Sequence, residues 1–481
     1  MKRILNRHFG IFIYFASLLC GLFVLYQGRS LGLFPMPQPG MDQLSILECA
    51  GRLADGSLPS EPYRYSYAYT LFLALLHLVT GGSLIWMRIL QLALCSLIPL
   101  FLYRSARLLG LGKAAGQAGA LCYLFYGPAL LISLDFLRAA TLGLVFLLFF
   151  YFLLLGWRLR SWKYFAAAGG MGALCILGRE NFAAVVPVVL LAWLMPRFRK
   201  RMGWRAAAGY AAALIVPVLA VMLFNFFRWN SFQPVPGNAG NVFAFYHGAE
   251  AVNRISVFAG KLIASIPVQI GNFFSSYELE NSLSFYAHRE LIVFLRVFLL
   301  PFHLLVVLAF AGAWRYRRNG GVRTAFLLIA LYAGSLLCFT IFYRFRIPAV
   351  PLIALLAGAG ISAIGAWWRR RNFRALATVA VLGGGFLWLT SVAPDSRRTF
   401  DERAAVARIL IDHGRFGEAE TYLAKMQNDG YDIRAGALLL AQHLAANGDD
   451  AWARVVVERF IGPLPPSAPA GAPAAPTSTR K

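Results

Sequence analysis

Long apolar runs separated by short clusters of basic residues make up roughly the first 390 positions of the chain. About 20 consecutive apolar residues are enough for a helix to cross the hydrocarbon of a bilayer. The pattern predicts an all-α polytopic membrane protein with about eleven transmembrane helices. Their expected ranges are 9–27, 84–103, 115–133, 137–156, 164–178, 181–195, a helix ending near 227, and 291–313, 324–342, 348–367 and 374–392.

One apolar run, residues 67–80, is too short to span comfortably. We expect it to form a helix at the outer interface. The helix that follows, 84–103, runs into Arg104, Arg107 and Lys113, which is typical of a cytoplasmic loop. No small-residue cleavage site follows the first apolar segment, so we expect that segment to be retained as a helix.

The charges separate by side. The chain has 46 Lys and Arg against 21 Asp and Glu, a net charge of +25, and the short loops that hold the basic clusters contain no acidic residue. The positive-inside rule then places these loops and the N-terminus in the cytoplasm. We predict a bacterial inner (plasma) membrane protein with its acidic loops and C-terminus on the outer, periplasmic side. Because the cations lie between spans, no nucleic-acid partner is predicted.

The composition divides the chain into three parts. Residues 1–392 form the membrane domain, with long outer loops at 28–83 and 228–290. Residues 393–461 carry charges of both signs, and Gly414 and Gly448 lie 34 positions apart in similar phrases, which is the tetratricopeptide period. We predict helical hairpins there that provide a surface for a protein partner. The Pro- and Ala-rich residues 462–481 are expected to be disordered.

The first outer loop holds the first candidate for chemistry. Asp42 follows a Pro- and Gly-rich turn and precedes an amphipathic stretch that contains Glu48. A carboxylate beside the membrane can accept a proton from an acceptor hydroxyl. An acidic residue at the start of a helix is also a common N-cap, so both interpretations stand.

Two further outer turns carry opposite charges. Asp135 and Arg138 flank the start of one span, and Arg179 and Glu180 lie between two short helices. An ionisable group at membrane depth is a functional hypothesis by default. The alternatives are a helix cap for Asp135 and an internal ion pair for Arg179 with Glu180.

The phrase FYRFRIP places two arginines, Arg344 and Arg346, at the predicted outer mouth of a span. The positive-inside rule disfavours arginine on that side, so a function has to offset the charge. Guanidinium groups bind phosphate in a bidentate manner, which suggests a lipid-phosphate site. Snorkelling of both side chains to lipid headgroups is the competing interpretation.

With these motifs in this order, the chain resembles glycosyltransferases of the GT-C fold that use polyprenyl-phosphate sugars, such as protein O-mannosyltransferases and the aminoarabinose transferase of lipid A. The resemblance covers roughly residues 1–370 and rests on Asp42, Asp135, the phrase RFRIP and a stretch that contains Tyr65 and Arg88. It implies transfer from a polyprenyl-phosphate or pyrophosphate sugar to an acceptor hydroxyl on a glycan, lipid or protein at the outer face, with membrane lipids around the donor tail.

The resemblance also implies roles for individual residues. Asp42 is similar to the catalytic carboxylate of the first outer loop, Asp135 to the acidic residue near the sugar or a metal, and Arg344 and Arg346 to ligands of the donor phosphate. Further candidates for substrate contact are Glu48, Tyr65, Arg88, Arg138, Arg179, Glu180, His247, Glu250 and Glu278.

Gln43 departs from the family pattern, because members often have a second acidic residue directly after the first-loop Asp. Metal use is therefore open; Mg²⁺ or Mn²⁺, if used, would have Asp42 and Asp135 as candidate ligands. The alternatives to this enzyme class are a lipid-linked-glycan flippase or transporter, an O-antigen ligase or polymerase, and a non-catalytic scaffold.

Overall fold

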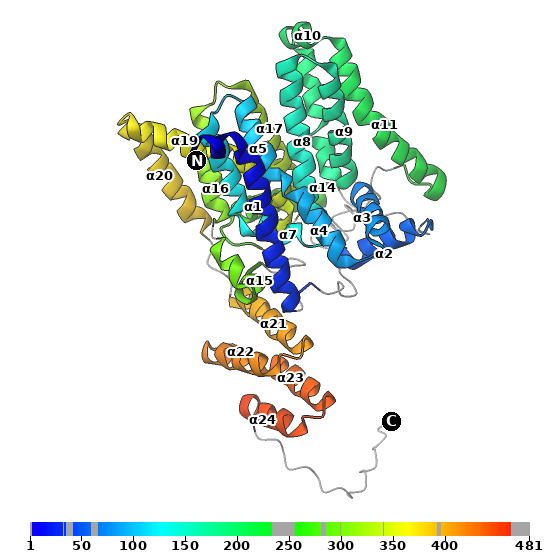
Figure 1. Ribbon diagram of the computed structural model, residues 1–481, viewed down its shortest axis with the longest axis vertical. Coiled ribbons are helices and arrows are strands. Elements are labelled where there is room, and N and C mark those ends of the chain that lie inside the picture. The colour runs from blue at the N-terminus through cyan, green and yellow to red at the C-terminus, as the bar shows by residue number, and fades with distance from the viewer. Residues whose placement is uncertain are drawn as a thin grey trace, which may run out of the picture. The chain divides into compact units, whose positions relative to one another are not determined.

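A computed structural model of the chain describes residues 2–31, 33–34, 42–58, 66–232, 255–279, 285–298, 300–339, 341–391 and 396–462 (Figure 1). Within these ranges all regular secondary structure is helical. The all-α fold class predicted from the sequence is confirmed. The disordered tail predicted beyond Gly462 lies outside the described residues.

The N-terminal helices are α1 (Lys2–Ser30), α2 (Asp42–Ala54), α3 (Tyr67–Thr80), α4 (Leu84–Cys95), α5 (Leu97–Leu108), α6 (Lys113–Leu124), α7 (Gly127–Ser133), α8 (Arg138–Leu159) and α9 (Trp162–Gly178). The central elements are the 3₁₀ helices η1 (Glu180–Ala184) and η2 (Pro187–Leu194), then α10 (Pro196–Met202), α11 (Trp204–Trp229), α14 (Ile255–Phe274), α15 (Phe285–Leu291) and η3 (Val293–Val297). The remaining elements are α16 (Phe302–Arg315), α17 (Gly320–Leu336), α18 (Tyr343–Arg346), η4 (Ile347–Ala349), α19 (Val350–Arg369), α20 (Phe373–Thr390), α21 (Ser396–Asp412), α22 (Phe416–Asn428), α23 (Arg434–Ala446) and α24 (Asp450–Phe460).

The chain is a multi-pass membrane protein. Seven segments of the described residues are long and apolar enough to cross a bilayer, and α6 with α7 would make an eighth although they meet at a bend of 64°. These eight coincide with eight of the predicted spans. The other three predicted spans are shorter elements: α9 and α17 have 17 residues each, and η1 with η2 covers the third. A 3₁₀ helix rises about 2.0 Å per residue, so this short segment reaches further than an α-helix of equal length would.

Two compact units make up the chain. The first contains the membrane helices, and the second contains residues 394–481 together with 30–33 and 286–291. The sequence places the start of the C-terminal region at residue 393 and assigns most of α15 to the second outer loop. In the structure, residues 286–291 of α15 fall in the second unit.

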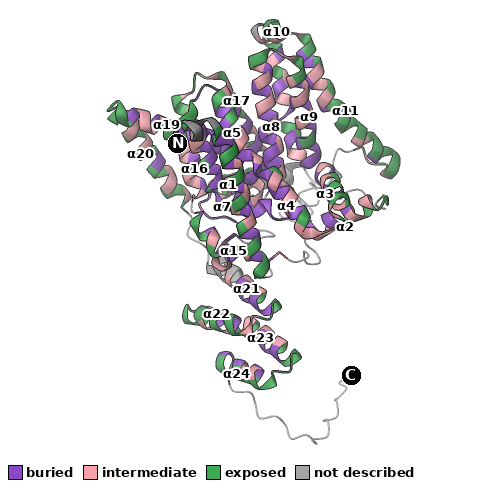
Figure 2. Cartoon of the chain, viewed as in Figure 1, coloured by how far each residue is buried: buried purple, intermediate pink, exposed green. Residues whose placement is uncertain are grey.

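In the first unit, α19 is the central helix. Its span is 83% buried, whereas the spans formed by α11 and α20 are each 17% buried. In Figure 2 much of the ribbon of both of those helices carries the colour of exposed residues. Glycines allow the backbone of α19 to approach its neighbours α16 and α6 closely. A Cβ atom on Gly360 would lie 1.9 Å from the carbonyl oxygen of Leu308, and one on Gly358 would lie 2.2 Å from that of Ala115. Small residues at such crossings are the usual basis of helix packing in membranes.

The four-residue helix α18 is anchored by a buried ion pair. Arg346 Nη2 lies 2.7 Å from Glu278 Oε2, and the two side chains are 1% and 4% exposed. The hydroxyl of Tyr126 donates to Oε1 of Glu278 at 3.0 Å. Burial raises the pKa of the Glu278 carboxyl from its ordinary value, while Arg346 and the Tyr126 hydroxyl act in the opposite direction. A buried pair of this kind holds its two segments together at a fixed position.

The other terminal nitrogen of the Arg346 guanidinium is also engaged, whereas Nε has no partner among the described residues. Nη1 donates to the carbonyl oxygens of Phe273 and Ser275, each at 2.9 Å. The guanidinium lies 4.0 Å from the centre of the Phe302 ring. Arg346 therefore joins α18 to the end of α14 and to the start of α16.

In the second unit, α21–α24 share a hydrophobic core that includes Leu410, Leu423, Leu440 and Val456. Gly414 lies in the turn between α21 and α22, and Gly448 lies in the turn between α23 and α24. Both have positive φ, +68° and +86°, the conformation that glycine adopts most easily after a helix. The 34-residue spacing thus marks two successive helical hairpins. Their assignment to the tetratricopeptide family stays a prediction.

Close helix approach around α19 predicts a selective effect of added volume. Gly360→Leu and Gly358→Leu force a side chain into neighbouring backbone, and overpacking typically costs about 1–3 kcal/mol. We expect both variants to lower the melting temperature of the detergent-purified protein. Gly365→Leu is the matched control, because no atom lies within 4 Å of its added Cβ. Equal melting temperatures for all three variants would contradict this packing.

The buried ion pair makes a second prediction. Glu278→Ala leaves the Arg346 charge buried without its carboxylate, and breaking such pairs typically costs about 3–5 kcal/mol. We expect a large fall in melting temperature, partly recovered in Glu278→Gln with Arg346→Gln. Glu48→Gln, at an exposed carboxylate on α2, should have no effect. Unchanged stability with lost activity in Glu278→Gln would instead favour substrate binding by Glu278.

Candidate active site

The helix α2 brings the first-loop candidates to the membrane domain. Its buried residues, Gln43, Ile46, Leu47 and Ala50, follow the i, i+3, i+4, i+7 spacing of one helix face. This face packs in one apolar cluster with α3, α4 and the residue after Asp135. The register of the apolar face therefore fixes the first turn of α2, where the polar candidates lie.

Asp42 is the first residue of α2, and its carboxylate faces Arg344 of α18. Arg344 Nη2 donates to Asp42 Oδ2 at 2.9 Å, across 302 positions of sequence. The Arg344 side chain is 12% exposed and that of Asp42 is 32% exposed, so the pair is open to solvent on one side. Among the described residues, Asp42 accepts no hydrogen bond from first-turn amides of α2, and the N-cap interpretation is not what the structure shows.

The ring of Phe345 lies between two arginines. The guanidinium carbon of Arg344 is 5.3 Å from the ring centre, and that of Arg179 is 4.1 Å from it. Arg179 also donates to the hydroxyl of Tyr332 at 3.4 Å, and this hydroxyl donates to the Phe345 carbonyl oxygen at 2.7 Å. The aromatic ring thus supports two cations that would otherwise repel each other.

Arg138 completes the group. It donates to the carbonyl oxygen of Gly178 at 3.2 Å, and it interacts electrostatically with Glu180, Arg179, Arg344 and Asp42. The structure therefore gathers five predicted residues into one group: Asp42, Arg138, Arg179, Glu180 and Arg344. We call it the outer charge cluster, after the side on which the sequence predicts these residues to lie.

Arg179 and Glu180 are the one pair in this cluster whose expected contact is missing. The sequence suggested an internal ion pair between them. Among the described residues no such pair forms, because Arg179 turns to Phe345 and Tyr332 instead. The cluster carries three guanidinium groups against two carboxylates, which leaves an excess of positive charge for an anionic ligand.

Asp135 belongs to a separate buried network beside this cluster. The side-chain amide of Gln43 donates to Asp135 Oδ2 at 3.0 Å, and the backbone amide of Phe136 donates to Oδ1 at 2.8 Å. The N-cap of α8 is Leu137 and not Asp135, so the predicted cap role does not hold. The Oε1 atom of Gln43 is buried and has no partner among the described residues.

Gln91 of α4 holds the backbone around Asp135. Its amide donates to the carbonyl oxygens of Asp135 at 2.7 Å and Ser133 at 3.0 Å, and its Oε1 accepts from the Tyr69 hydroxyl at 2.7 Å. Arg88, one turn earlier on α4, donates to the Leu134 carbonyl oxygen at 3.2 Å. The turn between α7 and α8 is thus fixed from α2, α3 and α4 together.

A metal ion has little to bind here. The described residues contain no group of three His, Cys, Asp or Glu side chains that could hold one. The carboxylates of Asp42 and Asp135 face a guanidinium group and amide donors respectively. These neighbours are cationic or hydrogen-bond donors and not the oxygen ligands that Mg²⁺ prefers, so no catalytic step is derived through a metal.

The remaining predicted residues lie apart from the cluster or outside the described chain. Glu48 is exposed on α2. Glu278 and Arg346 form the buried anchor described above. Tyr65, His247 and Glu250 lie outside the described residues.

Sequence reasoning did not identify several residues that build the site. Gln91 is a lone amide within an apolar helix, a signal that could have been used. Phe345 and Tyr332 look like ordinary aromatic residues at the end of a span. Only the fold reveals that they support Arg179 and Arg344.

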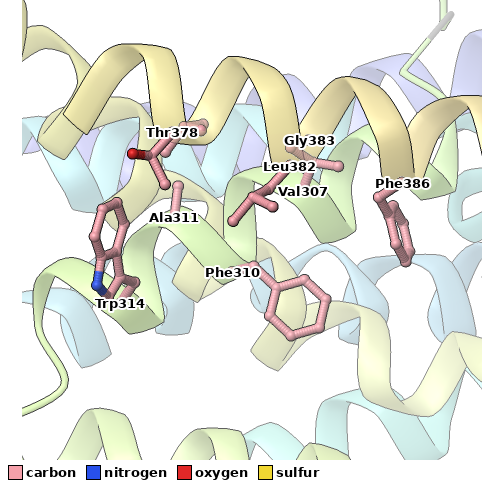
Figure 3. A pocket seen from close by; sticks show the side chains of 9 residues that line it. Val307, Phe310, Ala311, Trp314, Thr378, Leu382, Gly383 and Phe386 are labelled. Carbon is pink, nitrogen blue, oxygen red and sulfur yellow. The ribbon is translucent and has the colours of Figure 1, made fainter. Parts of the chain in front are cut away.

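The apolar cavity in Figure 3 is not a candidate for this chemistry. It has a volume of about 510 Å³ and lies between α16 and α20. Thr378 and the indole nitrogen of Trp314 supply the polar side-chain atoms of its lining. A sugar phosphate needs charged partners, which this lining lacks.

Comparison with known proteins gives a family match for part of the chain. No match was found among curated proteins. A family model described as dolichyl-phosphate-mannose-protein mannosyltransferase matches residues 63–221, about a third of the chain. The matched region includes Arg88, Asp135, Arg138, Arg179 and Glu180. The similarity supports a membrane glycosyltransferase of the GT-C type that uses a lipid-linked donor.

Proposed function

We propose that the protein transfers a sugar from a polyprenyl-phosphate donor to an acceptor hydroxyl at the outer face of a bacterial plasma membrane. The observation that carries the proposal is the contact between Asp42 and Arg344. These two residues lie near opposite ends of the sequence of the membrane domain. The contact places a carboxylate beside a group of arginines. This is the pairing of base and anion site that such a transfer requires.

The arginines are suited to the donor phosphate. When the anomeric C–O bond breaks, its electron pair leaves with the phosphate, and a phosphodiester anion becomes a phosphate dianion. Arg344, Arg179 and Arg138 are positioned to stabilise the added negative charge, and charge-assisted contacts to guanidinium are strong. Because Phe345 and Tyr332 already fix Arg179, little reorganisation is needed during the reaction.

Asp42 would act as the base. The acceptor hydroxyl gives its proton to the Asp42 carboxylate while its oxygen bonds to the anomeric carbon on the face opposite the phosphate, so the configuration inverts. In the structure Arg344 occupies one oxygen of this carboxylate. A bound phosphate would compete for Arg344 and leave the carboxylate free to take up the proton.

Arg346 has a different role in this proposal. Its guanidinium is 1% exposed and is held by Glu278 and by backbone carbonyl groups. We therefore assign the donor phosphate to Arg344 and treat Arg346 as the residue that positions it. Direct phosphate binding by Arg346 stays a prediction from the sequence.

The base is tested by Asp42→Asn. Loss of a general base typically reduces turnover by about 10²–10⁴-fold, and we expect a loss of this size with an unchanged melting temperature. The assay measures transfer from a panel of radiolabelled polyprenyl-phosphate sugars by membranes that contain each variant. Asp55→Asn, at an exposed carboxylate just after α2, is the matched control. Full turnover in Asp42→Asn would refute the assignment, and donor binding without transfer in the wild type would favour a flippase.

The phosphate site is tested by Arg344→Lys. Lysine keeps the charge but loses the planar fork that binds phosphate through two hydrogen bonds. We expect kcat/KM for the donor to fall by roughly tenfold or more, since a charged hydrogen bond contributes about 1.5–3 kcal/mol. Arg52→Lys, at an exposed position on α2, should retain wild-type kinetics. Wild-type kinetics in Arg344→Lys would show that the guanidinium fork is not used.

A further inference from the structure

A second cavity lies away from the outer charge cluster, between α17 and the segment formed by η2 and α10. Its volume is about 710 Å³, within the size range of small-molecule sites. Its lining is polar at one end and apolar at the other, and it contains neither Asp nor Glu. This one-sided polarity is what a membrane lipid would need.

The apolar end runs along one face of α17. Arg323, Leu327 and Leu331 all line the cavity and are spaced four residues apart, so they follow one stripe of the helix. Val188 and Leu191 line the opposite side. Leu191 and Leu327 are 55% and 49% exposed, and this part of the cavity therefore opens towards the surrounding lipid.

The charged end is formed by Arg201 and Arg323. Both are exposed and line the cavity. Neither side chain forms an ion pair or a hydrogen bond with another described residue, although the backbone amide of Arg323 donates to the Asn319 carbonyl oxygen. Thr324 lines the same end. The first amides of α17 do not add to this charge, because the side chain of Asn319 accepts from Gly321 and Val322.

This site is distinct from the outer charge cluster. Arg323 and Tyr332 lie on the same helix nine residues apart, about 14 Å along its axis at 1.5 Å per residue. Tyr332 is at the end that supports Arg179. Arg201 on α10 and Arg323 on α17 both fall in basic segments of the sequence that the charge pattern predicts to be cytoplasmic. The cavity thus faces the opposite leaflet.

We propose that this cavity binds an anionic diacyl phospholipid of the inner leaflet. The two arginines hold the headgroup phosphate, and one acyl chain follows the stripe from Leu327 to Leu331. A zwitterionic headgroup carries its own cation and gains less from paired arginines. The site does not depend on the proposed transferase activity.

The test titrates the detergent-purified protein with phosphatidylglycerol, with phosphatidylcholine of identical acyl chains and with polyprenyl phosphate, and native mass spectrometry measures the affinity for each. The wild type is expected to prefer phosphatidylglycerol. In Arg201→Gln with Arg323→Gln this preference should fall by roughly 25-fold, since each arginine near an anionic lipid contributes about fivefold. Arg318→Gln with Arg370→Gln removes two exposed basic groups that do not line the cavity, and should keep the preference.

A second variant tests the apolar half. Leu327→Trp fills the cavity and leaves both arginines in place, so it should also weaken phosphatidylglycerol binding. Neither cavity variant should change the melting temperature without lipid, because the altered side chains are exposed. Equal affinity for the two lipids, wild-type preference in Leu327→Trp, or a preference for polyprenyl phosphate over phosphatidylglycerol would each overturn the proposal.

Discussion

The buried contact between Arg346 and Glu278 is the constraint on which the outer charge cluster depends. Residues two positions apart on a helix point about 200° away from each other, at 3.6 residues per turn. In the single turn of α18, Arg346 is held inward by Glu278. Arg344 is therefore directed the other way, towards Asp42, and Phe345 lies between them with its ring beside Arg179. One buried ion pair thus sets the direction of the group that we assign to the phosphate.

A buried charge at this depth is costly unless every donor has a partner. The structure supplies acceptors for both Nη atoms, partly from the end of a helix, while Nε has no partner among the described residues. Phe273 is in the last turn of α14, where carbonyl groups lack helical partners and the helix dipole favours a cation. Arg346 donates to this carbonyl and to that of Ser275 just beyond it. The same guanidinium therefore neutralises Glu278 and caps α14, which ties two distant segments at one point.

The sequence predicted the membrane helices well because their signal is local. An apolar run and its flanking charges lie together in the chain, and nothing distant is needed to interpret them. The contact of Asp42 with Arg344 could be proposed only through family resemblance, since 302 positions separate the two. That Arg344 and Arg346 point in opposite directions could be inferred only once α18 was known to be helical. Likewise, nothing local indicated that α15 would pack with the C-terminal hairpins.

The helix α15 forms part of the core of the C-terminal hairpins. Ala287 of α15 is buried in their core, and Glu290 accepts a hydrogen bond from Tyr422 at 2.9 Å. Two hairpins are marginally stable alone, because stacked repeats stabilise one another. Within the second unit, part of the stabilising surface comes from a helix of the same chain. A partner protein would then meet hairpins that are already partly covered.

Gln43 joins α2 to the buried network of Asp135, while the residue before it, Asp42, belongs to the outer charge cluster. The enzymes that this chain resembles often have a second acidic residue at the position of Gln43. In this chain an ionised carboxylate at that position would repel Asp135, whereas the Gln43 side-chain amide donates to Asp135 at 3.0 Å. Its neighbour Asp42 is turned towards Arg344 instead. The first turn of α2 therefore separates two carboxylates into two environments, one open to solvent beside Arg344, the other buried among amide donors with Arg88 near it. Only the first is suited to take a proton from an incoming acceptor, and this argues for Asp42, not Asp135, as the base.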